Sequence, residues 1–191
     1  PYPFDGLTDK THGLRRGELI TVCAGTGVGK SQFCRQVTDT LLQDGEKVGY
    51  IALEESVQRT VEGLMSLRLN KAIHTDTRDW SDLSDAEQTE RMKVYHQLKG
   101  LYCYDHFGSI DSQNLINRIR FMAKACDVHW VVLDHLSIMS SAFADGDERR
   151  LIDQIAQDGG MALPDHQQDP LAFMAFQLVH SPIQTPKLHY H

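Results

Sequence analysis

Residues 24 to 31 carry the clearest chemical signal in the chain. They read Ala-Gly-Thr-Gly-Val-Gly-Lys-Ser, after an apolar run over 19–23 and before a stretch of helical character over 32–42. Glycine residues let backbone N–H groups close around phosphate oxygens, a lysine adds positive charge, and a serine hydroxyl can ligate Mg²⁺. A strand, such a turn and a helix are together typical of the phosphate-binding loop of a P-loop NTPase.

We expect this loop to hold a nucleoside triphosphate and its magnesium ion. Its predicted nucleotide-binding residues are Gly25, Thr26, Gly27, Val28, Gly29, Lys30 and Ser31. Lys30 is expected to act in catalysis on the β- and γ-phosphates, and Ser31 to ligate Mg²⁺ at a helix N-terminus. Ala24 replaces the first glycine of the motif, where a small residue should be tolerated. The alternative is a glycine-rich turn that has a lysine beside it by chance.

A second metal ligand is predicted at the end of another apolar run. Residues 131–133 are Val-Val-Leu and are followed by Asp134. A buried strand that ends in one acid is the form of a Walker B element, whose acid holds the magnesium ion through water. The alternative role for Asp134 is a turn or a helix N-cap.

The general base is predicted at a third place in the sequence. Many P-loop ATPases have a glutamate directly after the Walker B acid, but here that residue is His135. A different apolar run, over 50–53, is followed by Glu54 and Glu55. An acid at the C-terminal edge of the adjacent parallel strand would face the ligand, so we predict Glu54 as the catalytic base. Glu55 is expected to cap the next helix or to face solvent. Alternatively, both acids only favour the start of a helix.

The elements that must position these residues alternate between strands and helices. Strands are predicted over 18–24, 47–53, 100–104, 130–134 and 171–178, and helices over 31–43, 57–69, 86–98, 112–124 and 148–156. This alternation predicts an α/β fold with a mostly parallel sheet and helices on both faces. The helix over 112–124 has an apolar face, and 74–85 is expected to form a polar surface loop.

Length and composition limit the function classes. A chain of 191 residues suffices for one α/β domain, and a net charge of −7 disfavours a uniformly basic surface for nucleic acid. The four cysteine residues show no metal-site spacing and are expected to be reduced, buried thiols. No apolar run approaches the ~20 residues of a membrane span, so we expect a cytoplasmic protein with no membrane contact.

We divide the chain into a lead-in over 1–17, an ATPase core over 18–180 and a disordered tail over 181–191. The core contains a stretch, 157–170, in which glycine and proline residues interrupt polar ones. Because glycine and proline are unfavourable inside a helix, the preceding helix should end near residue 157. The tail has neither periodicity nor a charge pattern.

Several motifs in order resemble the helicase domain of phage primase–helicases and mitochondrial Twinkle. These are DnaB-like replicative helicases with a RecA core. The resemblance rests on residues 7–18, 48–56, 133–138 and 147–153 and covers about 1–156. In that family Lys30 and Ser31 match the phosphate and magnesium residues, Glu54 the catalytic glutamate and Asp134 the Walker B acid.

The resemblance implies a RecA-like fold and a homo-hexameric ring. Such a ring hydrolyses ATP or dTTP between its subunits, with Mg²⁺, and moves along single-stranded DNA to unwind the duplex. It also implies a primase domain or other replisome proteins as partners, and a phage-infected bacterial cell as the location. Gln177 matches the catalytic residue that senses the γ-phosphate. One alternative is that the register slips and His180 takes this role. The other is that Gln177 is an ordinary amide at a strand end. His135 matches the family's Asp-His pair and is expected to be packed and hydrogen-bonded.

The last part of the chain departs from the family pattern. Residues 157–170 stand where the family has a helix, and only Lys187 follows where the family has a basic DNA loop. The arginine finger is expected beyond residue 191. DNA contact is expected from the loop over 139–146, with 149–150 as phosphate contacts or as a solvated helix start.

Two alternatives stay open. One is a RecA/RadA-like recombinase or another RecA-core ATPase. The other is a nucleotide-binding fragment with little turnover, because arginine fingers contribute about 10³–10⁵ in rate in NTPases that use them.

Overall fold

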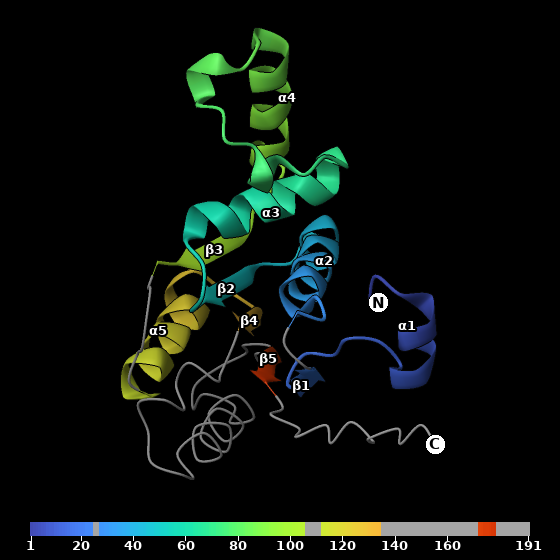
Figure 1. Ribbon diagram of the computed structural model, residues 1–191. Coiled ribbons are helices and arrows are strands. Elements are labelled where there is room, and N and C mark those ends of the chain that lie inside the picture. Colours follow the sequence, from blue (N-terminus) through green and yellow to red (C-terminus); the bar gives the residue numbers. More distant parts are fainter. Residues whose placement is uncertain (25–26, 106–111, 135–171, 179–191) are drawn as a thin grey trace, which may run out of the picture.

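The chain folds around one parallel β-sheet. A computed structural model describes residues 1–24, 27–105, 112–134 and 172–178. Its strands lie in the order β1-β5-β4-β2-β3, and each neighbouring pair is parallel (Figure 1). They are β1 (Leu19–Ala24), β2 (Val48–Ala52), β3 (Leu101–Tyr104), β4 (Trp130–Asp134) and β5 (Ala172–Leu178). Each strand differs from its prediction by at most one residue at either end, and the α/β fold is confirmed.

Helices cover both faces of this sheet, as predicted. They are α2 (Lys30–Gln43), α3 (Val57–Leu69), α4 (Asp85–His96) and α5 (Ser112–Ala125). Apolar side chains of α2, α3 and α4 form one core with β2 and β4, and α5 forms a second core on the opposite face of the same two strands. All residues of β2 and β4 are buried, because both of their faces are covered. This burial on both faces explains why the sequences of β2 and β4 are almost continuously apolar.

The strand order corrects one expectation. We expected the strand before Glu54 to be adjacent to the strand of the glycine-rich loop, but β5 and β4 lie between β1 and β2. The neighbour of β2 on that side is β4, with Ala52 in register with Asp134. The expectation was wrong because apolar periodicity describes each strand separately and does not say which strands pair.

Local signals set the ends of the two helices nearest the loop. Helix α2 begins after Gly29, which has φ 94°, and is followed by a turn in which Gly45 has φ 81°. Both values lie in the left-handed region that favours glycine. Helix α3 begins after Ser56, whose side chain accepts a hydrogen bond from the Arg59 N–H at 3.3 Å, a typical N-cap. It ends at Asn70, which is left-handed with φ 48°.

Three short elements were not predicted. The lead-in contains α1 (Asp5–Thr11), and the segment expected to be a polar loop contains two 3₁₀ helices, η1 (Ile73–Thr75) and η2 (Trp80–Asp82). The lead-in packs on α2, where the Phe4 and Phe33 rings stack with centroids 5.7 Å apart. Each element is shorter than two helical turns, so no periodicity could reveal it.

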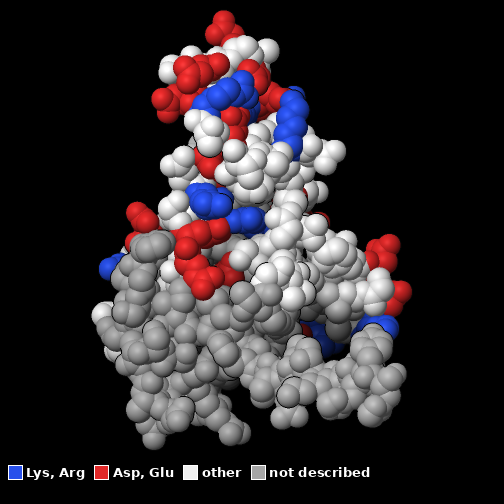
Figure 2. Space-filling model, in the orientation of Figure 1, with Lys and Arg blue, Asp and Glu red and all other residues white. Residues whose placement is uncertain are grey.

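Helix α4 and the 3₁₀ helix η2 project beyond α3, away from the sheet (Figure 1). Acidic and basic side chains are mixed on this projecting end (Figure 2). Asp76 pairs with both Arg78 and Arg91, and Arg78 also pairs with Glu87. The visible surface of this end is therefore neither uniformly acidic nor uniformly basic.

Some predictions fall outside the described residues. These are the helix over 148–156, the broken stretch over 157–170, the tail over 181–191, and the loop over 139–146. No helix among the described residues is long and apolar enough to cross a membrane. Cys34, Cys103 and Cys126 are free thiols, and Cys34 is fully buried.

Candidate nucleotide-binding site

The glycine-rich loop joins the end of β1 to the start of α2. Gly27 and Gly29 both have positive φ, 75° and 94°, so this turn depends on residues without a Cβ. Gly29 is the N-cap of α2, and its carbonyl accepts a hydrogen bond from the Phe33 N–H at 3.0 Å. Val28 lies at the exposed tip between the two glycines, with 71% of its surface accessible.

Lys30 and Ser31 are the first two residues of α2 and are half-buried. At this position the free N–H groups and the dipole of the helix favour an anion. Gly25 and Thr26 lie outside the described residues. Strand β1 before the loop and helix α2 after it give the strand–turn–helix order that the motif requires.

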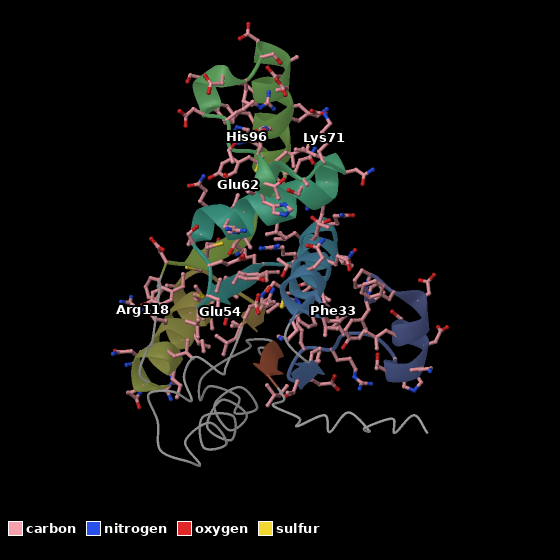
Figure 3. The ribbon with its side chains drawn as sticks, viewed as in Figure 1. Phe33, Glu54, Glu62, Lys71, His96 and Arg118 are labelled. Atoms are coloured by element: carbon pink, nitrogen blue, oxygen red, sulfur yellow. The ribbon has the colours of Figure 1, made fainter. Side chains whose placement is uncertain are left out.

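The two predicted acids lie at the same edge of the sheet as the loop. All five strands are parallel, and each of these residues lies at or just after the C-terminal end of a strand. Asp134 is the last residue of β4 and is 4% exposed. The Leu53 N–H donates to the Asp134 carbonyl oxygen at 2.8 Å, which places the residue after β2 against the end of β4. Glu54 comes next and is exposed to solvent (Figure 3). Thus Glu54 and Asp134 follow neighbouring strands.

The Asp134 carboxylate is held in a buried polar cluster below the loop helix. Tyr50 donates its hydroxyl hydrogen to Asp134 Oδ2, with the oxygens 3.4 Å apart. Burial raises the pKa of the Cys34 thiol, and the charge of Asp134 raises it further. Burial likewise raises the pKa of Tyr50, helped by repulsion from Cys34 and Asp134. Since Cys34 belongs to the first turns of α2, Asp134 lies close to the end of the helix that carries Ser31.

These residues fit a magnesium ion. A serine hydroxyl and a carboxylate are hard oxygen donors, and Mg²⁺ is commonly held by one or two such protein groups together with nucleotide phosphates and water. Both donors are half-buried or buried, at the end of β4 and the start of α2. Nucleotide phosphates would complete the remaining coordination.

Glu55 has a different place from the one we expected. It is not the cap of α3, which is Ser56, and it does not face solvent. Its carboxylate accepts from Arg35 Nη2 at 2.5 Å and from the Thr60 hydroxyl at 2.8 Å. The prediction was wrong because the partner, Arg35, lies on a separate helix that sequence spacing does not relate to Glu55.

Gln177 lies one residue before the end of β5, in register with Cys23 of β1. Because β5 is between β1 and β4, this position lies between the strand that leads into the loop and the strand that ends in Asp134. The side chain of Gln177 lies outside the described residues, as do His135 and His180.

Comparison with known proteins now identifies the family. The family model described as the DnaB-like helicase C-terminal domain matches residues 1–158. The chain belongs to the DnaB-like helicase family. It is also 36% identical over 156 residues to a DNA helicase/primase of Enterobacteria phage T3, a match that covers 78% of this chain and 27% of that protein.

Membership of the DnaB-like helicases confirms the resemblance seen in the sequence, and with it the RecA-like core fold. The family is one of replicative helicases, in agreement with the relative's name. Sequence reasoning missed Arg35 and Tyr50 at this site. A charged residue among the buried positions of a helix, next to Cys34 and Val37, is the signal that could have found Arg35. Tyr50 is indistinguishable from an ordinary strand residue.

Proposed function

We propose that the chain is the NTP-hydrolysing core of a replicative DNA helicase that works as a homo-hexameric ring. In this ring, hydrolysis of ATP or dTTP drives movement along single-stranded DNA and unwinding of the duplex. The observation that supports it most strongly is the meeting of the glycine-rich loop, Asp134 and Glu54 at one edge of the sheet. The similarity to a phage helicase/primase supports DNA and replisome proteins, including a primase, as partners.

Each group has a defined task in this proposal. The backbone N–H groups of the loop and the Lys30 ammonium bind the triphosphate. Ser31 and Asp134 would hold Mg²⁺, which neutralises charge on the β- and γ-phosphates when bound. Glu54 orients the attacking water and accepts its proton. Gln177, near the end of β5 between the loop strand β1 and β4, is the proposed γ-phosphate sensor.

Glu54 is better placed than its neighbour Glu55 to reach an attacking water. Both Glu55 oxygens already accept hydrogen bonds, from Arg35 and from Thr60, so the carboxylate is occupied by protein partners. Glu54 is exposed at the loop edge, where water can reach it. The geometry therefore favours Glu54 for proton transfer.

The decisive experiment compares Glu54→Gln with Glu62→Gln. Glu62 lies on α3 and accepts from Gln58 at 2.7 Å, remote from the loop edge, so its substitution is a matched control (Figure 3). We expect Glu54→Gln to reduce nucleotide hydrolysis by at least ~10²-fold with unchanged nucleotide affinity, and Glu62→Gln to change neither. Hydrolysis by Glu54→Gln at the wild-type rate would remove the proposed base.

The family match favours a helicase over a recombinase with the same core. Duplex unwinding and strand exchange are measured with the same labelled oligonucleotides, so one set of substrates separates the two activities. Unwinding without strand exchange is the expected result, and strand exchange without unwinding would contradict the proposal.

A further inference from the structure

A buried ion pair joins the loop helix α2 to the turn that contains Glu54. Arg35 Nη2 and Glu55 Oε2 are 2.5 Å apart, and their side chains are only 9% and 15% exposed. The second oxygen of Glu55 accepts from Thr60 Oγ1 at 2.8 Å. The carboxylate is thus fixed from two helices, α2 and α3.

The Arg35 guanidinium is also confined by α3. A Cβ built on Gly63 would lie 2.4 Å from Arg35 Nε and 2.6 Å from its Cζ, closer than atoms can approach. The Arg35 side chain therefore lies against α3 at Gly63, in a space that a Cβ on residue 63 would occupy. Within the described part of the chain, its buried Nε has no hydrogen-bond partner.

Stability alone gives little reason for this arrangement. A buried ion pair often contributes no more to stability than apolar residues of the same size, because both charges must be desolvated. A buried donor without a partner adds a further cost. The benefit of the Arg35–Glu55 pair must then be sought in the geometry that it imposes.

Glu54 lies between two residues that are both held. On one side Leu53 is 1% exposed, and its N–H donates to the carbonyl of Asp134 at 2.8 Å. On the other side Glu55 is held by Arg35. Arg35 lies on α2 about one helical turn after Ser31. Fixing both neighbours fixes the backbone from which the Glu54 side chain extends.

We propose that Arg35 and Glu55 are positioning residues, which set the place of Glu54 relative to the phosphate end of α2. The inference rests on the proposed function, because it takes Glu54 as the base. Neither residue needs to touch nucleotide or water. A base displaced by about 1 Å can cost ~10²-fold in rate, so the pair would affect turnover more than nucleotide binding.

The same two helices supply a matched control pair. Arg68 Nε of α3 and Asp39 Oδ1 of α2 are also 2.5 Å apart, with side chains 11% and 12% exposed. This pair has the same chemistry and burial, but it lies one turn further along α2, away from the loop. A merely structural role would give both pairs the same consequences.

The test replaces both members of each pair, so that no charge is left buried without a partner. Arg35→Met/Glu55→Leu is compared with Arg68→Met/Asp39→Leu for kcat, KM, nucleotide Kd and Tm. For the first variant we expect kcat to fall about 10- to 100-fold, with Kd within about threefold of wild type. For the control variant we expect a comparable change in Tm and a kcat within about twofold of wild type.

A second measurement does not depend on turnover. The ¹⁵N order parameter of the Glu54 amide should be near ~0.85 in the wild type and the control variant, and below ~0.6 in Arg35→Met/Glu55→Leu. Equal order parameters and equal kcat values in the two variants would overturn the inference. If Glu54→Gln retains full activity, the proposed base fails instead, whatever the ion pair does to the order parameter.

Discussion

At the scale of single residues, the site depends on side chains whose partners come from distant parts of the chain. Arg35 of α2 meets Glu55 after β2, and Tyr50 of β2 meets Asp134 at the end of β4. The sequence identifies the chemistry-bearing residues, because the glycine-rich loop and the strand-end acids are local patterns. It does not identify the residues that hold them, because those contacts depend on the packing of separate helices and strands.

Gly63 gives a residue-scale prediction. Alanine normally favours a helix over glycine by about 1 kcal/mol, but at Gly63 its Cβ would meet the buried Arg35 guanidinium. We expect Gly63→Ala to lower the free energy of unfolding by about 1–3 kcal/mol, as overpacking does in cores. Urea denaturation measures the change.

The control for this prediction is Gly6→Ala. Gly6 lies inside α1, and a Cβ there would meet no atom within 4 Å. This substitution should therefore leave stability unchanged or raise it by up to about 1 kcal/mol. If both variants were stabilised, Arg35 would be free to move aside and would not be confined as described.

At the scale of elements, helix termini determine where functional side chains lie. Helix α2 starts at the loop because Gly29 adopts a left-handed conformation, and α3 starts after the Glu54 turn because Ser56 caps it. Serine before an apolar-periodic stretch is a signal visible in the sequence, and α3 was predicted with its observed bounds. The start of α4 was predicted one residue late, although Ser84 and Glu87 form a capping box there.

That capping box leads to a prediction on pH. Hydrogen bonds from the Ser84 side chain and backbone, and then from Arg78, lower the pKa of Glu87 from 4.5 to about 2. An acid whose pKa is lowered by folding stabilises the folded state above its unfolded pKa. This contribution is complete above about pH 4.5 and is lost as the pH falls toward 2.

The measurement is the Tm difference between wild type and Glu87→Gln as a function of pH. Wild type should have the higher Tm at pH 7, and the difference should shrink steadily below about pH 4.5. Gln113→Ala removes an exposed hydrogen bond between two neutral side chains of α5, Gln113 Nε2 to Asn117 Oδ1 at 3.3 Å, and should give a difference independent of pH. A Glu87→Gln difference that stayed constant down to pH 3 would show that the carboxylate charge is not responsible.

At the scale of the whole molecule, the fold was predictable and the strand order was not. Alternating apolar runs and helices determined a parallel α/β sheet, since buried parallel strands need apolar residues on both faces. The position of β5 between β1 and β4 comes from pairing across the whole chain. Hence the sequence predicted the edge of the sheet at which the site lies. It did not predict that two strands separate the strand before Glu54 from the strand before the loop.

The net charge of the molecule leads to a prediction about DNA. With 19 Lys and Arg residues against 26 Asp and Glu residues, and mixed charges on its visible projecting end, the chain has no excess of positive charge for a phosphate backbone (Figure 2). We expect weak binding of single-stranded oligonucleotide that decreases steeply between 50 and 200 mM salt, roughly as the number of phosphate contacts dictates. Fluorescence anisotropy over a salt series measures the slope. Tight binding that persists at the highest salt would contradict this electrostatic account.

The position of β5 also has a consequence for how the chain folds. Among the described strands, β1 pairs only with β5, so the earliest of these strands in the sequence depends on the latest one. Contacts between residues so far apart in sequence form slowly, because closing the long intervening loop costs conformational entropy before the contacts can stabilise the fold. Strands β3 and β4 both pair with β2, so these three strands can assemble before β1 has a partner. The phosphate-binding loop, which joins β1 to α2, would then reach its final form only after β2, β3 and β4 have paired.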